Sequence, residues 1–437
     1  MQNSFRWNPY ADQPHNVLPR KKRFIHHLKY TPGYFRILTS NLKKAGPVLA
    51  AYRRYRKGRY EQPVSFNGSF GVAVSPAQGK DKEITERLKE LGIHHTLVRI
   101  PSWEKDRISF YENFIKFLHE QGIEVMVALL QHRRDVEEPS HWEGFVEEVF
   151  SRLSDGCSYF EIGHAWNRTK WGLWDFREYL RLVRPVLSLA SSYGVHLVGP
   201  AVIDFEFHLY PPVLKEISFD VVSSLLYVDR MGPPEKAQFG WDLSRKLALL
   251  KAVVDVWTSS SQRLWITEMN WPLAGTEKYS PASGTPNVSE EEQADYLVRY
   301  YVLSLSSGFV ERVYWWQLAA PGYGLVDNRE SSWRKRPSYW ALKTMVKSLE
   351  GSYFVADLSQ PPARIFLFRK KEDLLGVCWS EGKPLEFCFS YPLEKVISQE
   401  GEELSTPFER VRVEASPKYV YFKKGHRKKL PQVRELG

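Results

Sequence analysis

Cysteine is scarce in this chain: Cys157, Cys378 and Cys388 are the only three among 437 residues. They are scattered and form no CxxC pair, which excludes a disulfide-stapled scaffold and gives no support to a zinc site. No apolar run approaches the roughly 18 residues of a membrane span. The N-terminal segment is polar and interrupted by proline, unlike the apolar region of a signal peptide. We therefore expect a cytoplasmic protein.

Acidic residues are almost missing from the N-terminal segment. Residues 1–62 hold 14 Lys and Arg but only Asp12 and Glu61, whereas the whole chain carries a formal charge of +10. The basic character thus belongs to one arm, and the body of the protein is close to neutral. A smaller basic cluster lies near the C-terminus at Lys423, Lys424, Arg427, Lys428 and Lys429.

What is abundant is apolar and aromatic material, at 43% and 14% of the residues, which excludes a disordered or low-complexity chain. Eight short apolar runs alternate with helical patterns between residues 66 and 345. The runs are 70–75, 96–100, 125–130, 159–163, 196–202, 220–226, 264–267 and 313–318. The helical patterns cover 81–91, 109–121, 141–153, 173–193, 242–256, 290–306 and 336–349, with a weak one at 211–217.

Eight strand–helix units predict an α/β fold of the (β/α)8 TIM-barrel type. A doubly wound open sheet is the competitor, but the first strand is followed by no GxGxxG or Walker motif. After residue 351, short β-rich stretches separated by turn residues predict a small antiparallel β domain. We expect four parts: a basic N-terminal helical extension (1–64), the barrel (65–350), the β domain (351–425) and a basic tail (426–437).

The predicted strand ends carry carboxylates, amides and tryptophans, the side chains that hydrogen-bond sugar hydroxyls and stack on sugar rings. The strongest segment is WITEMNW, in which Glu268 ends a buried strand. A carboxylate in that place is costly unless it is paired or used. An ion pair with Arg99 is the plain structural interpretation, and it is compatible with catalysis because an arginine lowers the pKa of a nucleophile.

The order of these segments resembles that of clan A glycoside hydrolases. The C-terminal part of the chain resembles the members of family 39 within that clan. The resemblance covers residues 66–425 and implies a retaining mechanism with a nucleophilic Glu after the seventh strand and an acid/base Glu after the fourth. It assigns the nucleophile to Glu268 of WITEMNW and a binding arginine to Arg99 of TLVRIP. By the same resemblance and by their strand-end positions, the expected substrate-binding residues are Arg99, Asn167, Tyr227, Asn270, Trp271, Trp316 and Gln317.

The chain departs from the family after the fourth strand. The family shows Glu-Ile-Gly-Asn-Glu-Pro-Asn, whereas this chain reads EIGHAWN. His164 stands at the amide position and Ala165 at the acid/base position. Leu225 also replaces the usual histidine two residues before the sixth-strand tyrosine.

Alanine cannot donate a proton, and general acid/base help contributes roughly 10²–10⁴-fold to such reactions. His164 is a candidate substitute acid and a candidate catalytic residue, although strand alternation predicts that it faces away from Ala165. Glu161 is expected to be structural. Asp204, Glu206 and Asp229 follow the fifth and sixth strands and are more typical of surface loops.

Three functions stay open at this point. One is a glycosidase acting on a cell-surface or intracellular glycan, with Glu268 as nucleophile and an atypical or missing acid/base. Another is glycosyl transfer from an activated donor whose leaving group needs no proton. The last is a degenerate barrel that binds glycan as a scaffold or sensor in polysaccharide or lipopolysaccharide assembly. None of them requires a metal or another cofactor.

The basic arm carries its own pattern. Phe35, Leu38, Leu42, Ala45, Leu49 and Tyr52 recur at helical spacing among basic residues, and Gly46-Pro47 suggests two short helices. Such a segment either lies on an anionic membrane surface, peripheral at its inner face, or packs its apolar face on the barrel. A near-neutral body without a reading motif argues against nucleic acid as a partner.

Overall fold

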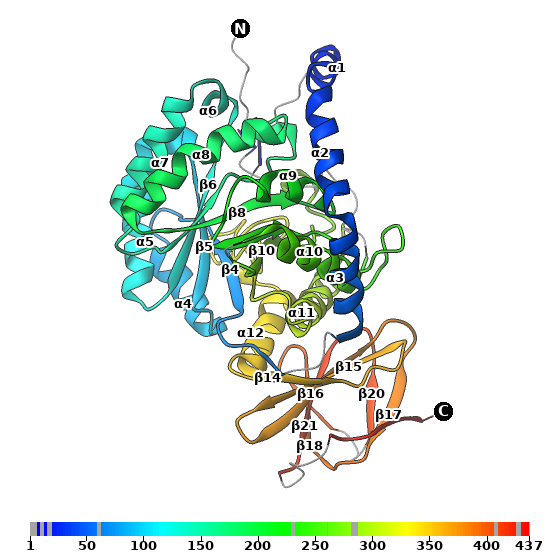
Figure 1. Cartoon of the computed structure of the whole chain (residues 1–437). Helices are drawn as coiled ribbons and strands as arrows, with labels where there is room; N and C mark the ends of the chain where they lie inside the picture. The colour runs from blue at the N-terminus through cyan, green and yellow to red at the C-terminus, as the bar shows by residue number, and fades with distance from the viewer. Residues whose placement is uncertain are drawn as a thin grey trace.

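The computed structural model describes residues 7–8, 13–14, 20–58, 63–228, 232–259, 261–280, 287–405, 410–424 and 430–436. Its centre is a closed barrel of eight parallel strands in the order β10-β11-β4-β5-β6-β7-β8-β9 (Figure 1). The strands are β4 (Phe70–Val74), β5 (His95–Pro101), β6 (Glu124–Leu130), β7 (Tyr159–Ile162), β8 (His196–Ile203), β9 (Val221–Leu225), β10 (Leu264–Met269) and β11 (Arg312–Trp315). Each coincides with one of the eight predicted runs, so the TIM-barrel prediction is confirmed.

Helices surround the barrel. They are α4 (Asp81–Leu91), α5 (Ile108–Glu120), α6 (Arg133–Glu137), α7 (Pro139–Leu153), α8 (Phe176–Tyr193), α9 (Tyr210–Leu214), α10 (Leu243–Trp257), α11 (Glu290–Ser306) and α12 (Pro337–Leu349). Local signals set their ends: the Asp175 carboxylate caps the start of α8, and Gly194, with φ of 64°, ends it. The helix predicted to be weakest is α9, a five-residue turn of helix.

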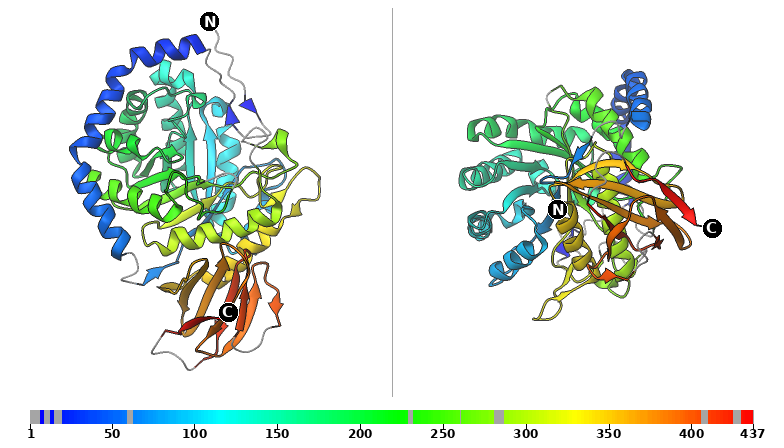
Figure 2. Two further views of the ribbon diagram at one scale, coloured as in Figure 1. Left: turned by 90° about the vertical axis from the view of Figure 1, so that its right-hand side faces the viewer. Right: turned by 90° about the horizontal axis from the view of Figure 1, so that it is seen from below.

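The C-terminal region forms two antiparallel sheets that lie together at one end of the barrel (Figures 1 and 2). The larger has the order β19-β18-β21-β16-β15-β14-β3, and the smaller is β20-β17-β22. Their strands are β3 (Val64–Ser65), β14 (Tyr353–Asp357), β15 (Ala363–Lys370), β16 (Asp373–Ser380), β17 (Leu385–Phe389), β18 (Leu393–Ser398), β19 (Glu403–Leu404), β20 (Arg410–Val413), β21 (Lys418–Phe422) and β22 (Val433–Leu436).

Buried polar contacts tie this region to the barrel. Glu235 forms a bidentate ion pair with Arg299 of α11, at 3.0 and 2.7 Å, and also accepts a hydrogen bond from Trp379 Nε1 of β16 at 2.7 Å. The expected basic tail falls partly outside the described residues, which omit 425–429 and 437, whereas β22 pairs with β17.

The N-terminal extension forms three helices, α1 (Arg20–Lys29), α2 (Thr31–Lys43) and α3 (Ala45–Gly58), which run along one flank of the barrel (Figures 1 and 2). The break at Lys44 lies just before the Gly-Pro pair that predicted it. The inner face touches the barrel: Asn41 Nδ2 donates to the His208 carbonyl at 2.8 Å, and Lys44 Nζ donates to the Val256 carbonyl at 2.7 Å. No helix of the described residues is long and apolar enough to cross a membrane.

Most of the apolar stripe singled out in the sequence faces solvent, whereas its last member, Tyr52, is half-buried against Trp241 at 5.5 Å between ring centroids. Phe35, Leu38, Leu42 and Leu49 are 66%, 53%, 65% and 46% exposed, and Phe24 and Leu28 of α1 are 64% and 60% exposed. Of the two interpretations of this stripe, packing against the barrel is therefore wrong for these side chains. A second set of residues makes that contact instead, because Gly33, Ile37, Val48 and Ala51 lie on the inner face.

Candidate functional site

Glu268 lies on β10, one residue before the strand ends, and its side chain points to the mouth of the barrel, where it is 7% exposed. Both carboxylate oxygens have partners. Arg99 Nη2 of β5 donates to Oε2, and the hydroxyl of Tyr227, two residues beyond β9, donates to Oε1. Strand ends of a closed barrel converge, so three residues far apart in sequence meet at one carboxylate. An oriented, charged carboxylate of this kind can act as a nucleophile or hold a ligand hydroxyl.

Arg99 connects this carboxylate to the aromatic wall. Its guanidinium carbon lies 3.3 Å from the centroid of the Trp316 ring, and the side chain is 9% exposed. Stacking and ion pairing together fix the plane of the guanidinium. The predicted Arg99–Glu268 ion pair is therefore present, beside the tryptophan that was expected to form the sugar platform.

His164 joins Arg99, Tyr227 and Trp316 around Glu268, and we call these residues the Glu268 cluster. This position corrects the expectation from strand alternation that His164 faces away from Ala165. Its Nε2 lies 3.2 Å from Arg99 Nη2 and 3.5 Å from Glu268 Oε2. The physical reason is that β7 ends at Ile162 and alternation ends with it. Gly163 has φ of 79°, a left-handed conformation that turns the chain, and Ala165 has φ of 41°.

The His164 imidazole is neutral at pH 7. Arginine can only donate hydrogen bonds, so Nε2 accepts from Arg99 and the ring proton sits on Nδ1. Burial, followed by the charges of Arg99 and Lys170, holds the pKa of His164 well below its usual 6.5. His164 Nδ1 is buried without a hydrogen-bond partner among the described residues. A neutral imidazole is a poor proton donor, which weakens its case as a substitute acid.

The other carboxylates that the sequence brought into consideration are engaged with other groups where the structure describes them. Arg168 pairs with Asp204 at 2.6 Å and with Glu206 at 2.5 Å. Asp229 lies outside the described residues. Glu161 is 1% exposed inside the barrel and accepts a hydrogen bond from Thr267 Oγ1 at 2.7 Å. Burial raises the pKa of Glu161 to about 7.

The remaining expected binding residues make contacts within the barrel, and their role in binding stays a prediction. Asn167 ties the segment after β7 to β8, since its Oδ1 accepts from the Ile203 amide and its Nδ2 donates to the Ile203 carbonyl, both at 3.0 Å. Asn270 Nδ2 donates to the Trp316 carbonyl at 2.5 Å, and Gln317 Nε2 donates to Ser75 Oγ at 3.2 Å. Trp271 does not join the Glu268 cluster: it packs in the outer core, stacked on Trp315.

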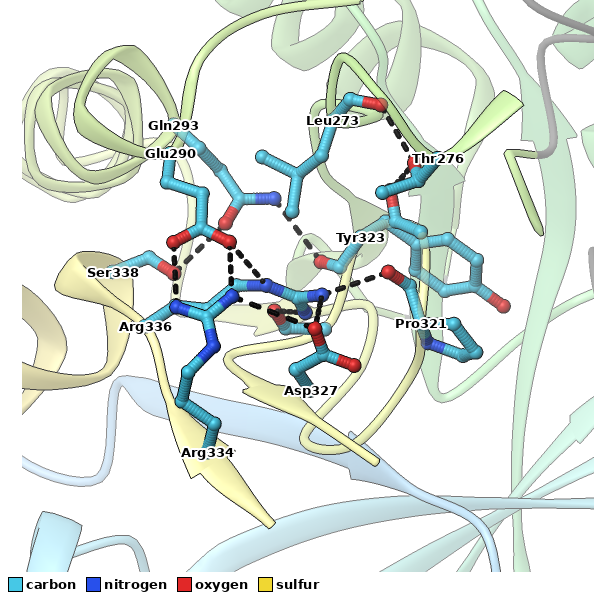
Figure 3. Close-up of polar contacts among 12 residues, drawn as sticks. Leu273, Thr276, Glu290, Gln293, Pro321, Tyr323, Asp327, Arg334, Arg336 and Ser338 are labelled. Carbon is cyan, nitrogen blue, oxygen red and sulfur yellow. Dashed lines mark hydrogen bonds and ion pairs between the residues drawn. The ribbon is translucent and has the colours of Figure 1, made fainter. Parts of the chain in front are cut away.

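The loop that carries Trp316 is held by Arg336, which is fully buried (Figure 3). Its guanidinium donates to the carbonyls of Ala320, Pro321 and Gly324 at 2.9, 2.7 and 2.7 Å, and pairs with Asp327 at 3.2 Å. Glu290 at the start of α11 accepts from Arg336 and from Arg334 of the β13 strand (Arg334–Lys335). This network fixes the wall of the site opposite β7.

Three tryptophans that were not among the expected site residues form an aromatic group at the mouth of the barrel. Trp171, in the turn Thr169–Trp171, meets His164 edge-on at 4.5 Å between ring centroids. Trp7, in a two-residue strand β1 (Trp7–Asn8), lies 6.3 Å from Trp171 and 5.3 Å from Trp103. Trp103 follows β5 and could have been found as a strand-end aromatic. Trp7 carries no local signal because its contact depends on tertiary docking alone.

Comparison with known proteins places the fold. The structure is similar to a family 39 glycoside hydrolase from the gut symbiont Bacteroides cellulosilyticus WH2, with 14% identity, a TM-score of 0.62 and coverage of 82% of this chain and 81% of that one. It is also similar to a GH30 endoxylanase from Clostridium papyrosolvens C71, with 12% identity, a TM-score of 0.58 and coverage of 83% and 98%. A third similar structure is the family 30 subfamily 8 xylanase Xyn30A from Clostridium acetobutylicum. It shares 12% sequence identity with this chain at a TM-score of 0.58, and the match covers 82% of this chain and 96% of that one. No protein-family profile and no curated sequence matches the chain.

Proposed function

We propose that this protein acts on a glycosidic bond by a retaining-type mechanism in which Glu268 is the nucleophile. The observation that carries the proposal is the Glu268 carboxylate itself, held by Arg99 and Tyr227 at the barrel mouth beside Trp316. Attack of a carboxylate oxygen on the anomeric carbon would form a glycosyl ester, with the electron pair of the broken bond leaving on the aglycone. The fold shared with family 39 and family 30 enzymes supports this assignment.

The preferred substrates in this proposal have leaving groups that depart without a proton. Ala165 cannot protonate a leaving oxygen, the neutral His164 is poorly suited to do so, and Asp204 and Glu206 are paired with Arg168. A glycosyl phosphate or nucleotide leaves as a stable anion. Glycosyl transfer from such an activated donor is therefore favoured over hydrolysis of an ordinary glycan linkage.

Labelling with 2-deoxy-2-fluoro glycosyl fluorides tests the nucleophile, because fluoride leaves without protonation and the fluorine at C2 slows release. We expect intact-protein mass spectrometry to show one added sugar unit, which peptide mapping assigns to Glu268. Glu268→Gln should abolish the labelling. The control Glu86→Gln, at an exposed carboxylate of α4, should label like the parent protein. Labelling that persists in Glu268→Gln would refute the assignment.

A glycan-binding barrel without turnover is the second candidate, and Ala165 at the acid/base position is the observation that favours it. This candidate predicts that no fluoro-sugar of the gluco, galacto, manno or xylo series labels the protein, while the corresponding glycosides still bind. Saturation-transfer NMR with those glycosides separates it from a protein that does not bind sugars at all.

We also propose that α1–α3 binds an anionic membrane surface. Residues 20–58 contain 12 Lys and Arg and no Asp or Glu. Within the described part of the chain, Lys43, Arg53, Arg56 and Lys57 are exposed and make no ion pair. They border the exposed apolar stripe of Phe24, Leu28, Phe35, Leu38, Leu42 and Leu49, which is the arrangement of an interfacial helix.

Vesicle flotation tests the membrane proposal. The full-length protein should float with vesicles of phosphatidylcholine and phosphatidylglycerol at low salt and much less with phosphatidylcholine alone, since each basic residue near an anionic surface contributes about 1 kcal/mol. Phe35→Glu combined with Leu42→Glu should abolish flotation. Tyr353→Glu, at a tyrosine of β14 that is 52% exposed, is the control. Equal flotation of the double variant would refute the proposal.

A further inference from the structure

A cavity of about 270 Å³ lies where α2 meets the segments that follow β7 and β8. Tyr30, Tyr34 and Ile37 line it from the extension, Trp166, Asn167, Thr169 and Trp174 from the segment after β7, and Glu206 and His208 from the segment after β8. The cavity is somewhat smaller than the roughly 300–1,000 Å³ of pockets for drug-sized ligands, so it suits a single ring. It exists only because α2 closes one side of it.

The charged groups of this cavity are already neutralised. The Glu206 carboxylate accepts from Arg168 at 2.5 Å and from Asn167 Nδ2 at 2.9 Å. Asp175 pairs with Arg177 at 2.7 Å and caps α8. A charged ligand would therefore find no unpaired counter-charge from these two residues, which favours a neutral one.

Neutral polar groups in the same walls keep hydrogen-bonding capacity. The Thr169 hydroxyl and the His208 imidazole form no hydrogen bond to a described side chain or backbone group. Burial lowers the pKa of His208, so its neutral ring offers one donor and one acceptor.

Aromatic faces complete the set. Tyr34 is 48% exposed and forms the solvent-facing edge of the cavity. Trp166, which lines the cavity, is stacked on Tyr179 at 5.1 Å between ring centroids, and this fixes the indole in the cavity wall. Rings that can stack, uncharged donors and acceptors, and room for one ring are the features that recognise a pyranose or furanose.

We propose that this cavity between α2 and the barrel is a binding site for a neutral saccharide, separate from the Glu268 cluster. The segment after β7 joins the two places, because His164 reaches Glu268 while Trp166 and Thr169, on the same segment, line the cavity. The choice of a saccharide among neutral ligands rests on the proposed carbohydrate function. The cavity itself does not, because Glu268 is not among the residues that line it. The saccharide is either part of a soluble glycan or the headgroup of a glycolipid, since α2 also carries part of the proposed membrane stripe.

Photoaffinity labelling locates the site directly. The probes are β-glucosides, β-galactosides, β-mannosides and β-xylosides that carry a diazirine on the aglycone, used with the full-length protein. We expect cross-links within residues 30–37 and 166–176. Tyr34→Ser combined with Thr169→Val should lower them about tenfold or more, because the double change removes a stacking face and a hydroxyl. Tyr353→Ser, at a tyrosine that is 52% exposed in β14, should change nothing.

The outcomes separate this proposal from the proposed function. Cross-links confined to residues 264–271 or 313–318 would overturn the second site while supporting the first. Cross-links to the cavity that persist in Glu268→Gln support the second site even where fluoro-sugars fail to label Glu268. Cavity labelling only by sugar phosphates would overturn the neutral-saccharide assignment. Competition by soluble methyl glycosides, or by vesicles containing monoglycosyl diacylglycerol, identifies the source of the saccharide.

Discussion

Replacing Glu161 by glutamine should change how the stability of the protein depends on pH. Glu161 is buried in the barrel interior, and its pKa is raised to about 7 because burial disfavours the charged form. The unfolded chain releases this proton near pH 4.3. Between these two values the folded protein holds a proton that the unfolded chain has lost, so stability falls as pH rises. The effect is complete above pH 7.

The size of the effect follows from the gap between the two pKa values. A gap of two to three pH units corresponds to about 3 kcal/mol of unfolding free energy, lost at about 1.4 kcal/mol per unit. Glutamine keeps the acceptor for Thr267 Oγ1 but has no proton to lose. The stability of Glu161→Gln relative to the parent protein should therefore improve by about 3 kcal/mol between pH 4.5 and pH 8.

Urea unfolding followed by tryptophan fluorescence at about pH 5, 6, 7 and 8 measures this difference. Other titrating groups cancel because both proteins share them. Glu86→Gln, at an exposed carboxylate, should show a constant difference from the parent over the same range. If the Glu161→Gln difference is equally constant, Glu161 titrates as an ordinary carboxyl and the argument from burial is wrong.

Three further substitutions test the contacts that hold the site. Arg99→Met should lower the free energy of unfolding by about 3–5 kcal/mol, because it leaves the Glu268 carboxylate buried without its ion-pair partner. Adding Glu268→Gln should recover more than half of that loss in urea unfolding. No recovery would mean that the two residues are not coupled. Glu235→Ala should lower the free energy of unfolding by a similar amount, because Arg299 and Trp379 Nε1 lose their buried acceptor. Calorimetry should then show the barrel and the β domain unfolding in separate transitions. A single unchanged transition would contradict this. Arg336→Met should expose the loop of residues 316–335 to limited proteolysis, and an unchanged digestion pattern would show that the loop does not depend on this clamp.

The barrel could be predicted from the sequence because its signals are local. Each buried strand is a short apolar run, and the helices between them have the capping residues and glycine stops that mark their ends. The convergence of Glu268, Arg99 and Tyr227 also followed, since the strand ends of a closed barrel meet at one mouth.

What the sequence could not predict depends on backbone turns and on docking. The left-handed Gly163 turns His164 into the cluster, against the alternation that held up to Ile162. Trp271 lies two residues beyond the end of β10, where strand alternation no longer predicts its direction. Its side chain packs in the outer core with Trp315 and not beside Glu268. The periodicity of α2 and α3 identified an apolar stripe, but a stripe has the same spacing whether it faces a protein or the solvent.

The course of the N-terminal helices along the flank has a geometric consequence. α2 touches His208, beyond the carboxyl end of β8, and α3 touches Asp255 near the end of α10, which leads into the start of β10. The extension therefore runs antiparallel to the strands, from the rim of the barrel to its floor. A flat surface that contacts the outer edge of the extension therefore meets the molecule side-on, and the carboxyl ends of the strands, where Glu268 lies, point along that surface rather than toward or away from it.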